Sequence, residues 1–199
     1  YMIFGLTSCE ICTMIESRKY KKLSQEAKSM LKDQVKDLLV QQVNKEFYSA
    51  YLYLNFANFY QSKGLSGFAN WYQVQAQEER DHAMLFNQYL LNNNAVVTLD
   101  AIDKPDTTLE TLMDPLKAGL AHEEYVTSLI YNLYATTQDV RDFRTMQFLD
   151  WFVKEQGEEE TNASDLITKM ELFGGDAKGL YMLDQELKAR VYAAPSLVL

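Results

Sequence analysis

Four long stretches of the chain carry an apolar residue every three or four positions, the spacing that puts one stripe on the core-facing side of an α-helix. They run from Ser24 to about Gln61, from Ser66 to about Asn92, from 111–115 to about 138, and from 141 to about 172. A shorter fifth stretch covers 178–191. The pattern predicts four helices of about seven to ten turns each, followed by a short fifth helix.

The connections between these stretches predict how the helices are arranged. The first pair is joined by a short breaker at Ser62–Gly64 and the second pair by a few residues, whereas a long polar segment, Val96–Thr111, separates the pairs. The third helix is expected to start either with Thr111 and Asp114 as a capping pair or with Pro115 at the first helical position. We therefore expect an all-α four-helix bundle with a long crossover between helices two and three and a short fifth helix.

Each of the four apolar stripes is interrupted by at least one carboxylate, at a similar height in the predicted bundle. The interrupting polar residues are Glu46, Glu79, His82, Glu123, Gln156 and Glu159. An unpaired buried carboxylate is costly, and only Lys45 offers a nearby basic residue among these stripes. The compensating charge is therefore expected to come from a cation outside the chain. Oxygen-rich, nitrogen-poor ligand sets suit iron or manganese, and a Glu and a His at i and i+3 point to the same helix face.

Composition narrows the classes of partner. The chain of 199 residues has 28 Asp and Glu against 19 Lys and Arg, a net charge of −9, which argues against nucleic acid or an anionic membrane surface as a partner. No window has the apolar length of a membrane span. Two Cys cannot form a disulfide framework, so a reducing, cytoplasmic location is expected. Because there are only two His, a metal site must depend mainly on carboxylates.

Several segments together resemble one family, the non-haem bacterial ferritins, over about Met30 to Arg190. The matching segments are 46–53 (EFYSAYLY), 77–82 (QEERDH), 122–123 (HE), 151–160 (WFVKEQGEEE) and 179–187 (GLYMLDQEL). The resemblance implies a ferritin-like di-iron domain over residues 30–192, an N-terminal extension over 1–29 outside the family core, and a C-terminal tail over 193–199.

The resemblance also implies which residues bind iron. Glu46, Glu79 and His82 would hold one iron, and Glu79 would bridge to a second iron held by Glu123, with Gln156 and Glu159 beside it. A third iron position would be formed by four acids, namely Glu78, Glu155, Glu158 and Glu159. Tyr53 matches a tyrosine beside the di-iron centre, where it would donate either an electron or only a hydrogen bond.

The activity implied by the resemblance is iron storage with ferroxidase activity. Fe(II) would be oxidised to Fe(III) by dioxygen or peroxide and stored as ferric oxyhydroxide mineral inside a hollow homo-oligomeric shell of 24 subunits. Haem is not expected, because Arg80 stands where bacterioferritins have a haem-binding Met. The fourth helix carries Gln156-Gly-Glu-Glu159 in place of a second Glu-x-x-His, which is the ferritin pattern. Bulk storage, detoxification and rapid iron release remain equally open roles.

Two other classes of function remain to be tested. One is a di-iron oxidase or oxygenase acting on an organic substrate, which would need a substrate channel. The other is a plain helical bundle that serves as an interaction module and binds no metal. Asp139 and Asp142 would either line an iron-entry pore or be solvated loop acids. Cys9-x-x-Cys12 is interpreted as part of a variable extension in preference to a zinc or redox site.

The net negative charge of the chain can be explained by acids that face the interior. Seven acids are assigned inward to metal, and removing them changes the net charge from −9 to −2 (−9 + 7). They are Glu46, Glu78, Glu79, Glu123, Glu155, Glu158 and Glu159. The sequence therefore predicts an acidic interior and a nearly neutral exterior. His122, next to Glu123, is expected to be a hydrogen-bonded neighbour and not a ligand.

Overall fold

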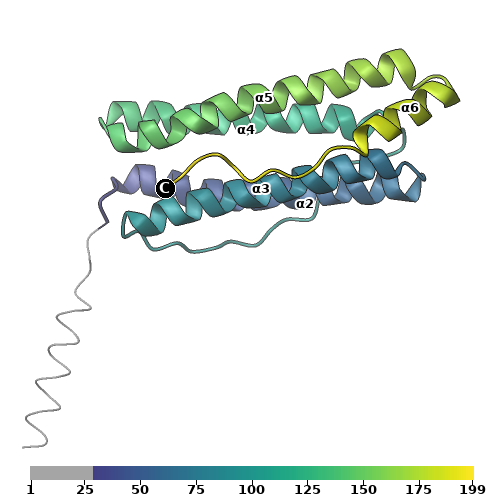
Figure 1. Ribbon diagram of the computed structural model, residues 1–199. Coiled ribbons are helices and arrows are strands. Elements are labelled where there is room, and N and C mark those ends of the chain that lie inside the picture. Colours follow the sequence, from purple (N-terminus) through teal and green to yellow (C-terminus); the bar gives the residue numbers. More distant parts are fainter. Residues whose placement is uncertain (1–28) are drawn as a thin grey trace, which may run out of the picture.

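The computed structural model describes residues 29–199, and within them the chain forms five helices and no strand (Figure 1). The helices are α2 (Asp33–Ser62), α3 (Ser66–Asn92), α4 (Asp114–Asp139), α5 (Phe143–Phe173) and α6 (Ala177–Leu187). The predicted all-α bundle with a short fifth helix is confirmed. No helix in this part of the chain combines the length and apolar character needed to cross a bilayer.

The helices form two layers, α2 with α3 and α4 with α5, and α6 lies across one end (Figure 1). Short turns join the helices within each layer, and Gly64 adopts a φ of 78° in the first of them, a conformation that glycine tolerates best. The crossover 93–113 runs along the outside of α2 to reach α4. The Asn44 side-chain amide holds this segment by donating to the carbonyls of Asp100 and Ala101, at 3.3 and 3.2 Å.

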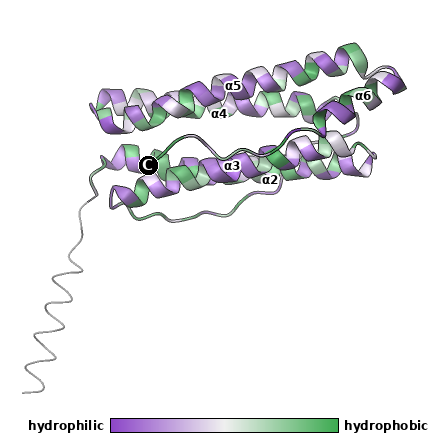
Figure 2. Ribbon diagram, viewed as in Figure 1, coloured by the Kyte–Doolittle hydropathy of each residue, from purple (hydrophilic) through white to green (hydrophobic). Residues whose placement is uncertain are grey.

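The predicted stripes face the interior of the bundle. Their apolar members are all buried except Leu120 and Tyr134, which are half-buried. These members are Leu39, Val43, Ala50, Tyr53 and Ala57 in α2, Phe68, Tyr72 and Phe86 in α3, Leu116, Leu120, Ile130 and Tyr134 in α4, and Leu149, Phe152, Ala163, Leu166 and Met170 in α5. The apolar core divides into two clusters, one that includes Phe86 and Phe152 and one that includes Tyr72 and Leu166. Figure 2 shows the resulting mixture of hydrophobic and hydrophilic residues along each long helix. Along the long helices, the buried glutamates Glu46, Glu79, Glu123 and Glu159 lie between the residues of the two clusters.

Two predicted helix ends differ from the structure. Residues 29–32 are not helical, so the first helix begins at Asp33 and does not extend continuously from Ser24; residues before 29, including the Cys9-x-x-Cys12 motif, lie outside the described part. The last helix ends at Leu187 and not at 191, because the chain leaves it to run back along α3.

The structure contains the Thr111–Asp114 pair, whereas the expectation of Pro115 at the first helical position is wrong by one residue, because α4 begins at Asp114. The Asp114 carboxylate accepts hydrogen bonds from the backbone N–H and from the hydroxyl of Thr111, each at 2.7 Å. Pro115 follows in the first turn, where its missing N–H costs nothing. The crossover therefore ends in a well-defined helix start.

A buried carboxylate attaches α6 to the start of α3. Asp184 accepts hydrogen bonds from the backbone N–H groups of Gly67 at 2.7 Å and Phe68 at 3.1 Å. Both groups belong to the first turn of α3, where no carbonyl of the same helix can accept from them. A Cβ atom on Gly67 would lie 1.6 Å from the Asp184 carbonyl oxygen, so the close approach of the two helices requires glycine there. This contact fixes where the chain leaves α6.

We expect Asp184→Ala to lower the free energy of unfolding by about 1–2 kcal/mol, because two N–H groups lose their acceptor. Asp184→Asn keeps an acceptor oxygen and should cost less. Urea denaturation followed by circular dichroism measures both changes. Equal stability of the Ala variant and the unaltered protein would show that Asp184 does not hold α6 in place.

Candidate metal centre

A layer of polar side chains crosses the interior between the two apolar clusters. Six of its members were predicted from the sequence, and all six are buried: Glu46 from α2, Glu79 and His82 from α3, Glu123 from α4, and Gln156 and Glu159 from α5. Each long helix therefore contributes a carboxylate to one buried region. The four carboxylates thus lie at a similar level along the bundle, as the interruptions of the four apolar stripes predicted.

Three of these side chains form a compact group that fits one metal ion. Glu46, Glu79 and His82 each offer a ligand atom within 4.8 Å of the others, and all three side chains are buried. His82 Nδ1 lies 3.6 Å from Glu79 Oε2, as expected for residues one helical turn apart. Two carboxylates and an imidazole form an oxygen-rich set that iron or manganese accepts.

Within residues 29–199, a single buried side-chain oxygen or nitrogen lacks a hydrogen-bond partner, and it is Glu46 Oε2. The other oxygen of this carboxylate accepts from Gln42 Nε2 at 2.9 Å. Buried polar atoms nearly always have a partner, so an unpaired one calls for an explanation. Because Glu46 belongs to the three-residue group, a bound cation is the simplest partner for this oxygen.

The remaining members of the layer surround Glu123. Its carboxylate accepts a hydrogen bond from the Tyr53 hydroxyl and another from Gln156 Nε2 at 3.2 Å. On the α5 side, Glu159 accepts from Gln75 Nε2 at 2.8 Å, and the same nitrogen donates to Glu79 at 2.9 Å. Gln75 thus links the two halves of the layer.

Packing several carboxylates together changes their ionisation. Burial, followed by the nearby Glu79 charge, raises the pKa of Glu46 and of Glu159 to about 8 and the pKa of Glu123 well above its ordinary range. Burial would also raise the pKa of Glu79, but contact with His82 and its charge outweigh burial and lower that pKa. Burial opposes protonation of His82, yet Glu79 raises the His82 pKa to about 10. At neutral pH these shifts favour the protonated forms of Glu46, Glu123 and Glu159 and an ion pair between Glu79 and His82.

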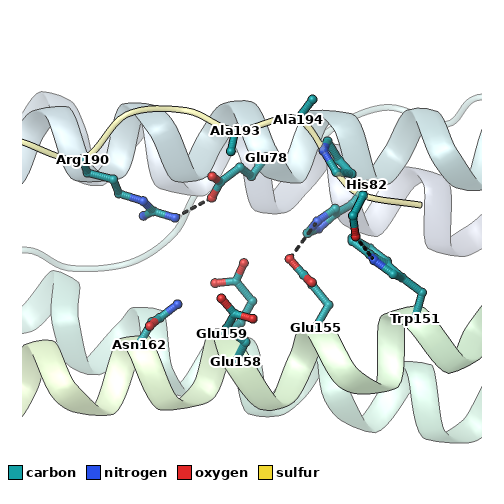
Figure 3. A pocket seen from close by; sticks show the side chains of 12 residues that line it. Glu78, His82, Trp151, Glu155, Glu158, Glu159, Asn162, Arg190, Ala193 and Ala194 are labelled. Atoms are coloured by element: carbon teal, nitrogen blue, oxygen red, sulfur yellow. Dashed lines mark hydrogen bonds and ion pairs between the residues drawn. The ribbon is translucent and has the colours of Figure 1, made fainter. Parts of the chain in front are cut away.

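The four acids predicted to form a third iron position come together on the side of the layer between α3 and α5. They line a pocket of about 240 Å³ (Figure 3). Glu159 is buried, Glu78 and Glu155 are half-buried, and Glu158 is exposed. The prediction that all seven acids lie inside is therefore wrong for Glu158, because it lies on the open side of α5. We call this the outer acid pocket: Glu78, Glu155, Glu158 and Glu159.

One cation in this pocket was missed by sequence reasoning. The Arg190 guanidinium donates to the carboxylate of Glu78 (Figure 3). It also donates to Gln75 Oε1 at 2.9 Å. Arg190 lies 112 positions after Glu78 and outside the four stripes, so no local pattern indicated the pair. It compensates charge at the edge of the layer, where only an external cation was expected.

Other predicted residues have identifiable partners. Tyr53 is buried, and its ring stacks on Tyr72 with the centroids 5.7 Å apart. His122 is half-buried and shares a 2.8 Å hydrogen bond with the Ser49 hydroxyl, as expected for a neighbour of the layer. Asp142 caps α5 by accepting from the backbone N–H of Thr145 at 3.1 Å, which supplies a structural reason for an acid at that position.

Comparison with known proteins gives one consistent result. The family described as "Ferritin-like domain" matches residues 36–173. The chain is 36% identical over 163 residues to the bacterial non-heme ferritin of Staphylococcus saprophyticus, covering 82% of this chain and 98% of that protein. It is 34% identical over 159 residues to the bacterial non-heme ferritin of Campylobacter jejuni, covering 80% and 95%.

Solved structures agree. The chain superimposes on a closed form of the Archaeoglobus fulgidus ferritin, engineered by site-directed mutagenesis, with a TM-score of 0.80 and 38% identity, over 82% of this chain and 99% of that chain. An open-pore ferritin from the same archaeon matches with a TM-score of 0.79 and 38% identity, over 81% and 98%. The order and packing of the helices are therefore those of these structures.

Because burial favours the protonated carboxyls in the absence of metal, we expect Zn²⁺ binding to release protons at pH 6.5 and its affinity to rise between pH 5.5 and 8. The raised pKa values of Glu46 and Glu159 favour the protonated native state. The metal-free protein should therefore lose stability as the pH rises from about 4.5 through 8, and bound Zn²⁺ should offset this loss.

Titration calorimetry in buffers of different ionisation enthalpy counts the released protons. Glu46→Gln, which carries no titratable proton at that position, serves as the comparison and should release fewer. Zn²⁺ binding with no buffer dependence and no pH dependence would contradict the protonated layer.

Proposed function

The chain belongs to the ferritin family, and from that premise we propose that it stores iron and that its buried polar layer is a ferroxidase centre. The observation that carries the proposal is the meeting of four carboxylates, one from each long helix, around His82 and an unpaired Glu46 oxygen. Fe(II) is the substrate, and dioxygen or peroxide is the oxidant. The product, Fe(III), is stored as ferric oxyhydroxide mineral within a hollow shell.

The two substrate ions take different parts of the layer in this proposal. Glu46, Glu79 and His82 hold the first Fe(II), and Glu79 bridges to a second Fe(II) held by Glu123. Gln156 and Glu159 lie beside the second ion. The separation of the layer into a compact trio and a Glu123 region supports this division.

The protein contributes charge, protons and positioning to the reaction. As each cation enters, protons leave the carboxyls whose pKa values are raised by burial, so the entering charge is neutralised locally. Hard, anionic oxygen ligands favour the trivalent product, and each Fe(II) gives one electron to the oxidant. Tyr53 orients Glu123 through its hydrogen bond, and its proximity also allows it to supply an electron.

The outer acid pocket is proposed as the third iron position, adjacent to the ferroxidase centre through Glu159. The shell is proposed as a homo-oligomer of 24 copies, with no haem, acting in the cytoplasm without nucleic-acid or membrane partners. The absence of a disulfide framework is consistent with that reducing compartment, since the chain has only two Cys.

A di-iron enzyme acting on an organic substrate is the main alternative. It needs a cavity beside the metal ligands, and substrate pockets usually measure several hundred Å³. The space bordered by Tyr53, Glu123 and Glu159 measures about 10 Å³, enough for a water-sized molecule. The outer acid pocket, which also borders the layer, measures about 240 Å³, but it is lined by four glutamates, whereas substrate pockets are lined mainly by apolar side chains. The packing therefore favours small reactants such as dioxygen. A bundle with only a scaffolding role would not explain four buried carboxylates.

We expect Glu123→Gln to slow the fast phase of Fe(II) oxidation by at least about tenfold, because the second ion loses a charged ligand. Glu124→Gln is the matched control, since it removes the next acid on α4 and Glu124 is exposed. Stopped-flow absorbance after mixing anaerobic Fe(II)-loaded protein with dioxygen measures the rate. Equal rates for the Glu123 variant and the control would rule out the proposed centre.

The assembly is tested separately from the chemistry. A shell of 24 copies of a 23.0 kDa chain has a mass of about 550 kDa (24 × 23.0), far above that of a single domain. Size-exclusion chromatography with light scattering measures this mass, and iron staining of the same fraction tests for mineral. Elution as a monomer or dimer would refute the shell.

A further inference from the structure

The last twelve residues, 188–199, run back along α3 and cover the outer acid pocket (Figures 1 and 3). We call residues 188–199 the C-terminal segment. The Asn70 side chain holds its start by donating to the Arg190 carbonyl at 3.0 Å. Farther along α3, the Tyr192 hydroxyl donates to Asp81. Leu197 then packs against the apolar cluster that includes Phe86.

Arg190 makes the contacts that lie nearest the acids. Its guanidinium donates to Glu78, to Gln75 Oε1 and to the Trp71 carbonyl, the last at 3.3 Å. It also stacks on the Trp71 ring, 4.2 Å from the centroid. The side chain is half-buried, so solvent screens these interactions only partly. No other Lys or Arg lines the outer acid pocket, within the part of the chain that the structure describes.

The contacts of Arg190 reach the ferroxidase layer through one intermediate residue. Gln75 accepts from Arg190 with its oxygen and donates with its nitrogen to Glu79 and Glu159. Glu159 belongs both to the layer and to the outer acid pocket. A change of charge in the pocket therefore acts directly on Arg190, and it acts on Glu79 and Glu159 through the hydrogen bonds of Gln75.

We propose that Arg190 is the internal counter-cation of the outer acid pocket, and that a metal ion binding there displaces it and releases the C-terminal segment. This inference rests on the proposed function, because it takes the pocket to be a metal position. Two cations cannot share Glu78 without repulsion, and a divalent or trivalent ion bound by several carboxylates outcompetes a single guanidinium. Docking of the segment and metal occupancy then oppose each other, and by thermodynamic linkage each weakens the other equally.

The release gives the pocket two states. With Arg190 in place, the segment covers the pocket and its acids are partly neutralised. With metal in place, the segment loses its strongest contact and keeps the hydrogen bonds of Asn70, Tyr192 and Ser196 and the packing of Leu197. The pocket then opens toward solvent beside Glu158, which is already exposed. Arg190 acts here as a positioning residue for the segment.

The chain carries its own reporters for this motion. It has two tryptophans, and both contact the C-terminal segment: Trp71 lies under Arg190, and Trp151 Nε1 donates to the Ser196 hydroxyl at 3.0 Å. Zn²⁺ titration of the full chain should therefore change tryptophan emission as the outer acid pocket fills. Trypsin cleavage after Lys188 and Arg190, identified by mass spectrometry, should accelerate at the same Zn²⁺ concentration.

Three variants separate the pocket from the layer. Arg190→Gln should bind Zn²⁺ in the outer acid pocket roughly three- to fivefold more tightly, the effect expected for removing a partly screened charge. Its cleavage after Lys188 should be fast with or without Zn²⁺. Lys188→Gln removes an equal charge from an exposed position in the same segment and should leave Zn²⁺ affinity unchanged. Glu155→Gln should weaken binding in the pocket and shift the emission change to higher Zn²⁺ concentration.

The outcomes distinguish this inference from the proposed function. Zn²⁺ bound in the layer, with emission and cleavage unchanged to saturation and with equal affinities in the Arg190 and Lys188 variants, would overturn the role of Arg190 and leave the ferroxidase centre standing. Absence of Zn²⁺ binding in the unaltered chain and in every variant would instead refute the proposed function. A folded state for each variant is checked by its melting temperature.

Discussion

Mutual repulsion among buried carboxylates is the constraint on which the rest of this molecule depends. Four glutamates from four helices occupy one layer in which charge is poorly screened. In the metal-free layer, burial favours protonation of Glu46, Glu123 and Glu159, and Glu79 lies against His82. One oxygen of Glu46 remains without a hydrogen-bond partner. In the proposed centre, a bound cation would pair with that oxygen and replace the protons, so the same arrangement that weakens the metal-free protein would favour metal binding.

The fold supports this layer from both sides. One apolar cluster lies toward Phe86 and Phe152, the other toward Tyr72 and Leu166, and together they hold the four helices at the spacing that brings the acids together. The contact of Asp184 with the start of α3 then directs the C-terminal segment along α3. That path delivers Arg190 to the edge of the layer. The contact of Asp184 at one end of the bundle thus places the positive charge of Arg190 at the outer acid pocket.

Much of this arrangement follows from local sequence patterns. The 3–4 periodicity predicts the long helices, and its interruption at Glu46, Glu79 and Glu123 predicts a shared polar layer, because residues of one stripe face one interior. Arg190 and Asp184 could not be predicted this way. Their partners lie more than 100 positions away, and such contacts depend on how α6 packs and not on any local period. The exposure of Glu158 likewise depends on the rotation of α5 relative to its neighbours.

The proposed function depends on iron binding by the buried layer between the four helices. Anomalous diffraction at the iron absorption edge, from crystals soaked anaerobically in Fe(II), tests it most directly. We expect one peak among Glu46, Glu79 and His82 and a second beside Glu123. A map without anomalous density in the layer, at an Fe(II) concentration that labels other acids of the protein, would contradict it.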